Sequence, residues 1–165
     1  MRNYGWILVM ILLTIVACDD SSNIPLKPLN LLQHGIPITI MAPDSAKVVA
    51  GSLSFSQDIT IKSEKDNFDI QLFAYDATTT NIEVVKAGHL AEVKGNTYFS
   101  KIIEEEEAGF IYETVYDSTT TNYGFKYLKI QGDKEYIFQT GLVGTFTLED
   151  VKIMYDAVKQ EKKEK

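Results

Sequence analysis

The chain has 165 residues, with 16 Lys and Arg against 23 Asp and Glu, and a formal net charge of −7 at pH 7. This length suits one domain with a hydrophobic core, and no internal repeat divides it. The acidic balance argues against nucleic acid or an anionic bilayer surface as the main partner, because both attract clustered cations. We therefore expect one acidic domain and no nucleic-acid partner.

The first 17 residues have the pattern of a secretory signal. Arg2 is followed by an apolar run from Trp6 to Leu13 and then by Ile15-Val16-Ala17-Cys18. A cation, a short apolar run and small residues before a cleavage point are typical of a signal peptide. The last four residues resemble the lipobox of bacterial lipoproteins. That resemblance implies signal-peptidase cleavage between Ala17 and Cys18, and a diacylglyceryl lipid on the Cys18 thiol.

The alternative is an uncleaved membrane helix from Trp6 to Ala17, with Cys18 as an incidental thiol. That apolar stretch is short beside the roughly 20 residues that span a bilayer. Cys18 is also the only cysteine of the chain, so no internal disulfide can explain it. We expect no cofactor other than the covalent acyl lipid on Cys18. We expect that lipid to hold the chain on a membrane of the bacterial cell envelope, facing the periplasm or the cell exterior.

Residues 18–30 have the composition of a flexible tether. They begin with the polar run Asp19-Asp20-Ser21-Ser22-Asn23 and contain Pro25 and Pro28. Without residues 1–17, which contain one cation and no acidic side chain, 148 residues with a net charge of −8 remain. We predict a single α+β domain at 31–160 and a charged tail at 161–165.

Short alternating runs predict strands in the first half of this domain. In each run, apolar side chains alternate with polar ones, as on a strand with one buried face. Runs this close together in the chain favour antiparallel hairpins. The runs are centred on Ile38 and Ile40, on Leu53 and Phe55, on Ile59 and Ile61, and on Phe68 to Ala74.

The period then changes to that of a helix over about 80–94. Thr80 and Glu83 fit a capping box, and Gly95 stands where a left-handed C-cap is favoured. The apolar side of this helix repeats at helical spacing. It contains Ile82, Val85, His89 and Val93.

Four further strand-like runs follow, at 98–104, 110–116, 123–130 and 135–140, with Gly132-Asp133 as a hairpin turn. A second helix is predicted at about 148–160. Thr147 is a good N-cap with Asp150 at the capping-box position, and Phe146 and Val151 form a hydrophobic staple. We expect both helices to cover one face of an antiparallel sheet in a layered α+β domain.

This order of elements resembles the PsbP-like fold. The resemblance extends from GIPITIMAP to LEDVKIMYDAVK and includes the strand KEYIFQTG. Photosystem extrinsic proteins and a nuclear import factor that binds a small GTPase share that fold, so the resemblance implies a role in binding or assembly. It carries over no functional residue.

Candidate catalytic and metal-binding residues are few. The chain has no G-x-S-x-G motif, and His34 and His89 are 55 positions apart, so we interpret both as structural. A concave pocket that brought either histidine beside a carboxylate would reopen an enzymatic interpretation. Glu104 to Glu107 could attract Ca²⁺, but neighbouring side chains of a strand point to opposite faces, so we predict a solvated hairpin end. The sequence therefore predicts no enzyme and no metal site.

Tyrosines are the remaining candidates for an interaction surface. Tyrosine is enriched at protein interfaces, although ordinary cross-strand packing would explain the same residues. The candidates are Tyr112, Tyr116, Tyr123 and Tyr127. We expect a membrane-anchored, non-enzymatic binding or assembly module for an envelope protein partner. The alternative is a carrier of a small hydrophobic ligand or lipid, with a pocket between the sheet and its helices.

Overall fold

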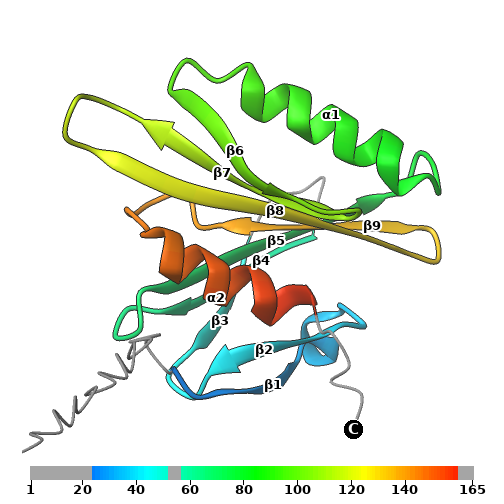
Figure 1. The fold of residues 1–165 in the computed structure, drawn as a ribbon. Coiled ribbons are helices and arrows are strands. Elements are labelled where there is room, and N and C mark those ends of the chain that lie inside the picture. Colours follow the sequence, from blue (N-terminus) through cyan, green and yellow to red (C-terminus); the bar gives the residue numbers. More distant parts are fainter. Residues whose placement is uncertain (1–23, 52–56, 160–165) are drawn as a thin grey trace, which may run out of the picture.

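A computed structural model describes residues 24–51 and 57–159 of the chain (Figure 1). Several predicted features lie outside the described residues: the signal 1–17, the lipobox Ile15 to Cys18, the start of the tether, the run with Leu53 and Phe55, and the tail 161–165. The described chain is an α+β fold with one large antiparallel sheet, as predicted.

Seven strands form the large sheet, in the order β3-β4-β5-β9-β8-β7-β6, and all neighbours are antiparallel. Because β9 lies between β5 and β8, it joins the first half of the chain to the second. The strands are β3 (Lys47–Ala50), β4 (Gln57–Ser63), β5 (Phe68–Asp76), β6 (Phe99–Glu105), β7 (Gly109–Val115), β8 (Thr121–Gln131) and β9 (Lys134–Thr140).

A second sheet contains only β1 (Leu26–Asn30) and β2 (Thr39–Pro43), which are joined through the short 3-10 helix η1 (Leu32–His34). The fold therefore begins at Leu26, inside the range predicted to be tether. The tether prediction failed here because Leu26 and Leu29 pack against the main core. Pro28 is compatible with this strand because β1 has a partner on one side only, where a missing N–H can be tolerated.

Helices α1 (Ile82–Lys94) and α2 (Leu148–Lys159) lie on opposite faces of the large sheet (Figure 1). The prediction that both cover one face is therefore wrong. The side chains of β8 alternate in direction. The rings of Phe125 and Tyr127 pack on Tyr155 of α2, while Lys126 between them bonds to α1. None of the helices in the described part of the chain is long and apolar enough to cross a membrane.

The main core surrounds α2, which contacts the large sheet on one side and β2 on the other (Figure 1). Val151 and Met154 of α2 and Ile40 of β2 are fully buried there. A smaller core beneath α1 is made by Leu90, Val93 and Phe110. Helix α2 is thus held on two sides, whereas α1 is held on one.

The start of α2 confirms the predicted capping box. The Thr147 hydroxyl accepts from the backbone N–H of Asp150 at 3.2 Å, and the Asp150 carboxylate accepts from the backbone N–H of Thr147 at 2.9 Å. Phe146 and Val151 are both buried, as the staple requires.

The start of α1 differs from the prediction. Asn81, and not Thr80, is the N-cap, because its side-chain oxygen accepts from the N–H groups of Glu83 at 3.0 Å and Val84 at 3.3 Å. Gly95 ends the helix in the right-handed region, with φ −77°, so the left-handed cap was also wrong.

Candidate functional site

Helix α1 covers only part of its face of the large sheet. It contacts β8 and β6, and among the described residues no helix covers β5 and β9 on this side (Figure 1). Phe73 and Tyr75 of β5 point to this side with stacked rings, 6.2 Å apart and 17° from parallel. Their cross-strand partners on β9 are Ile137 and Glu135. We call Phe73, Tyr75, Ile137 and Gln139 the open face.

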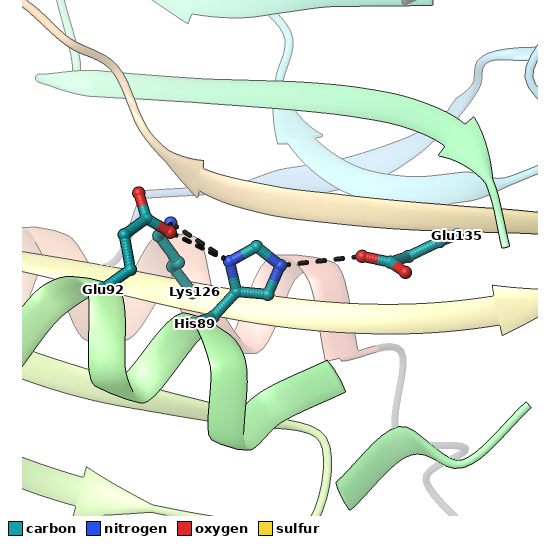
Figure 2. Close-up of polar contacts among 4 residues, drawn as sticks. All are labelled: His89, Glu92, Lys126 and Glu135. Atoms are coloured by element: carbon teal, nitrogen blue, oxygen red, sulfur yellow. Dashed lines mark hydrogen bonds and ion pairs between the residues drawn. The ribbon is translucent and has the colours of Figure 1, made fainter. Parts of the chain in front are cut away.

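A pocket of about 470 Å³ lies where the open face meets α1. The open face forms its floor. Its charged wall consists of His89 and Glu92 from α1, Lys126 from β8 and Glu135 from β9, which lie together in Figure 2. Four elements, β5, α1, β8 and β9, therefore contribute to one site.

The imidazole of His89 lies between two carboxylates (Figure 2). Its Nδ1 is 3.1 Å from Glu92 Oε2, and its Nε2 is 3.6 Å from Glu135 Oε1. The first pair is three residues apart on one helix, which places both side chains on the same face. A neutral imidazole donates from only one nitrogen, and an ionised carboxylate only accepts. A neutral His89 can thus bond to one of these carboxylates at a time.

Lys126 extends from the middle of β8 to the same carboxylate. Its side chain is only 8 % exposed, and Nζ donates to Glu92 Oε2 at 2.8 Å. His89 Nδ1 is 3.4 Å from that ammonium. A buried ammonium needs such a partner, because loss of its hydration is costly. The hydrogen bond from Lys126, and a weaker one from His89, lower the pKa of Glu92 below its ordinary range.

The charges of the pocket do not cancel. Lys126 and Glu92 neutralise each other, so with a neutral His89 the carboxylate of Glu135 leaves one negative charge. The Glu135 side chain is 12 % exposed and lies opposite Tyr75 in the sheet register. A carboxylate in a pocket that aromatic side chains also line is a favourable environment for an organic cation. The geometry therefore suits a ligand with a positively charged group.

The acidic run Glu104 to Glu107 lies at the end of the β6–β7 hairpin, as predicted, and Glu105 and Glu107 are exposed. Two of its carboxylates are nevertheless paired with cations of the helices. Glu105 Oε1 lies 3.2 Å from Lys86 Nζ of α1, and Glu106 Oε1 accepts a hydrogen bond from Lys159 Nζ of α2 at 2.7 Å. These contacts link the β6–β7 turn to both helices. No group of three His, Cys, Asp or Glu side chains among the described residues could hold a metal ion.

The four candidate tyrosines do not form one surface. Tyr112 packs against the small core beneath α1, above Gly124. Tyr123 and Tyr127 pack against the main core on the opposite face, where the Tyr127 ring is 6.0 Å from that of Tyr155. Only Tyr116 is exposed, at 50 %. The other sequence-predicted site residues, Ala17 and Cys18, lie outside the described residues.

His89 was a candidate from the sequence alone, but the rest of its cluster was not predicted. Glu92 was detectable, because it follows His89 by three positions in a predicted helix. Lys126 was a weaker signal, as a cation within the apolar run YGFKYLKI. Glu135 carried no local signal, because its place beside His89 depends on β9 lying between β5 and β8.

The fold and the site define this protein as an α+β domain with a seven-stranded antiparallel sheet, a helix on each face and a charged pocket at the edge of α1. Comparison with protein families, curated proteins and solved structures finds no match.

Proposed function

We propose that the chain is a lipid-anchored, non-enzymatic binding module of the bacterial cell envelope. In this proposal it holds an envelope protein partner against the open face and takes a cationic side chain of that partner into the pocket. The observation that carries the proposal is the carboxylate of Glu135. It is largely buried beside Tyr75, and its ion-pair partner among the described residues is the imidazole of His89.

The open face supports a protein partner over a small free ligand. Phe73, Tyr75 and Gln139 are only half-buried, and they form the floor of the pocket. Aromatic side chains on such a surface offer a partner rigid apolar area, while the charged wall gives orientation. A lysine or arginine of the partner would bring its own cation to Glu135.

A carrier of a hydrophobic ligand or lipid is the second candidate and has less support. The side of α2 that faces the large sheet is occupied by buried side chains, including Val151 and Met154. The pocket beside α1 has charged walls, which would cost free energy against an apolar ligand.

An enzyme also has less support, although the pocket does bring His89 beside carboxylates. The described residues that line the pocket include no Ser, Thr or Cys that the imidazole could activate as a nucleophile. Binding of a cation by Glu135, by contrast, needs no group beyond those that already line the pocket.

The PsbP-like architecture is part of this proposal. Its support is the order of elements, in which strands β2 to β5, helix α1, the four strands β6 to β9 and helix α2 follow one another. The cell-envelope location is supported by the lipobox-like residues Ile15 to Cys18.

The anchor is tested by mass spectrometry and by labelling with radioactive palmitate in a bacterial host. We expect the processed chain to begin at Cys18 and to carry acyl lipid. The substitution Cys18→Ala should abolish the label and leave the chain uncleaved or released from the membrane. Label that survives Cys18→Ala would contradict the anchor.

The pocket is tested with two matched probes, acetyl-arginine amide and acetyl-citrulline amide, which differ in charge but hardly in shape. In NMR titrations of the labelled processed chain in detergent micelles, we expect the arginine probe to shift the amide signals of Glu135 and Gln139. Citrulline should not, and Glu135→Gln should remove the arginine response. Equal responses to both probes would contradict the cation site.

The partner is tested by photocrosslinking in intact cells. A photoreactive residue at Gln139, on the open face, should give discrete protein crosslinks that Glu135→Gln weakens. The same group at Lys152, on the exposed side of α2, is the control. Crosslinks of equal strength at both positions would argue against the open face as the binding surface.

A further inference from the structure

The loop between β9 and α2 exposes two large apolar side chains side by side. Leu142 is 76 % exposed and Val143 is 81 % exposed, the highest values among the large hydrophobic residues that the structure describes. Gly141 and Gly144 flank them. Burial of apolar side chains is favourable, so the pair would gain free energy from an apolar environment.

Three further exposed apolar side chains lie at the same end of the molecule. Tyr98 and Tyr116 are 47 % and 50 % exposed, with ring centroids 4.8 Å apart, and Val115 is 37 % exposed. The start of β8 is tied to the β9–α2 loop, because the Asn122 side chain accepts from the N–H of Phe146 at 2.7 Å. We call Tyr98, Val115, Tyr116, Leu142 and Val143 the apolar end.

The described chain also starts at this end. Lys27 of β1 pairs with Asp44, and the neighbouring Ser45 hydroxyl lies 2.7 Å from that of Ser63. Ser63 and Val143 line the same depression of about 290 Å³. Figure 1 shows the start of β1 on the same side as the β9–α2 loop.

The covalent chain limits how far this end can be from a lipid on Cys18. Eight residue steps separate Cys18 from Leu26. At 3.3–3.6 Å per residue, they span at most about 29 Å. A lipid at Cys18 therefore keeps the start of β1 within about 29 Å of the lipid-bearing residue.

We propose that the apolar end faces the membrane and that Leu142 and Val143 insert into its interfacial region. This inference rests on the proposed function, because it takes Cys18 as the lipid-bearing residue. Tyrosines such as Tyr98 and Tyr116 suit the headgroup level, where an apolar ring meets a wet hydroxyl. Acidic groups at this end, including Asp44 and Asp66, favour apolar contact with a zwitterionic surface over attraction to anionic lipid.

The chain offers a clean fluorescence test. Its only tryptophan, Trp6, lies in the signal and is lost on processing, so Val143→Trp gives the lipidated chain a single reporter. We expect the tryptophan of the lipidated chain in phosphatidylcholine vesicles to emit at a shorter wavelength than the tryptophan of the lipase-treated chain in detergent-free buffer. Brominated acyl chains should quench it. The control Val84→Trp, on α1 and 59 % exposed, should show neither effect.

Each outcome either supports or overturns the insertion of Leu142 and Val143 into the membrane. Quenching of the reporter at 143 and not at 84 supports the inference. Absence of quenching at 143 in a chain whose mass confirms acyl lipid overturns it and leaves the proposed anchor intact. A chain without acyl lipid overturns the inference and the anchor together. A shorter emission wavelength without quenching, dependent on protein concentration, would show that a second copy covers the apolar end, which also overturns it.

Discussion

The ammonium of Lys126 on β8 donates to the carboxylate of Glu92 on α1 at 2.8 Å, and this ion pair joins α1 to the sheet beside the pocket. The two partners differ in their surroundings, since the Lys126 side chain is nearly buried and that of Glu92 is 64 % exposed. A helix held on one side only depends on such a link more than α2 does.

Glu92→Gln should destabilise the fold by about 1 kcal/mol, because it leaves a nearly buried ammonium without its counter-charge, while water around Glu92 screens part of the effect. Adding Lys126→Met should recover stability, since an apolar side chain of similar length needs no partner. Urea unfolding measures both. Asp76→Asn, which breaks the exposed pair with Lys134, is the control and should change little. If Glu92→Gln and Asp76→Asn lowered the free energy of unfolding equally, the role of burial would be contradicted.

Glu106 should make the fold sensitive to acid. Hydrogen bonds from Lys159 first, and from Tyr155 second, lower the pKa of Glu106 below its ordinary range. The unfolded state therefore binds this proton more readily. The stabilisation is complete above the ordinary pKa of an unfolded glutamate and is lost as pH falls through the lowered folded value.

We expect Glu106→Gln to lower the free energy of unfolding at about pH 7 and to differ much less from the parent at about pH 3, where that contribution is already lost. Urea unfolding at both pH values measures the difference. Glu107→Gln removes the same charge from an exposed neighbour and should keep the pH dependence of the parent. An undiminished difference in acid would show that Glu106 acts through packing instead.

The two candidate caps of α1 are separable by substitution. Asn81→Ala should cost about 1 kcal/mol, because the N–H groups of Glu83 and Val84 lose their acceptor. Thr80→Ala should cost little, since Thr80 precedes the cap. Thermal unfolding of the two variants compares them directly. A larger loss from Thr80→Ala would restore the capping box that the sequence predicted.

Features set by neighbouring residues could be predicted from the sequence. The capping box of Thr147 and Asp150 needs residues only three positions apart, and the β8–β9 turn at Gly132, with φ 65°, has a local glycine signal. The cap of α1 was harder, because Thr80 and Asn81 are adjacent and both suit an N-cap. Strand β1 was not predicted because it contains Pro28, and proline indicates a linker unless the strand lies at the edge of a sheet.

Features set by distant residues could not be predicted. The faces occupied by α1 and α2 depend on how the alternating side chains of β8 are shared between two helices, and YGFKYLKI fits either arrangement. The pocket depends on β9 pairing with β5, which brings Glu135 opposite Tyr75 across 60 positions of the chain. Local periodicity contains no information on that pairing.

Two glycines should respond in opposite directions to alanine. Gly88 lies within α1, and a Cβ there would meet no atom within 4 Å. Gly88→Ala should therefore stabilise the fold by about 0.5–1 kcal/mol, since alanine loses less backbone entropy in a helix. At Gly109 a Cβ would come within 2.7 Å of both the Lys126 carbonyl oxygen and the Tyr155 hydroxyl.

The crowding at Gly109 involves the main chain of β8, which cannot rotate away as a side chain would. Gly109→Ala should consequently shift β7 against β8 and cost about 1–3 kcal/mol. Urea unfolding measures both variants on one scale, and the arginine probe tests whether α1 keeps its place. Because Gly88 precedes His89, a variant that gains stability and still binds the probe would show that the pocket needs no flexibility in α1. Stabilisation by Gly109→Ala would contradict the close packing of β7, β8 and α2.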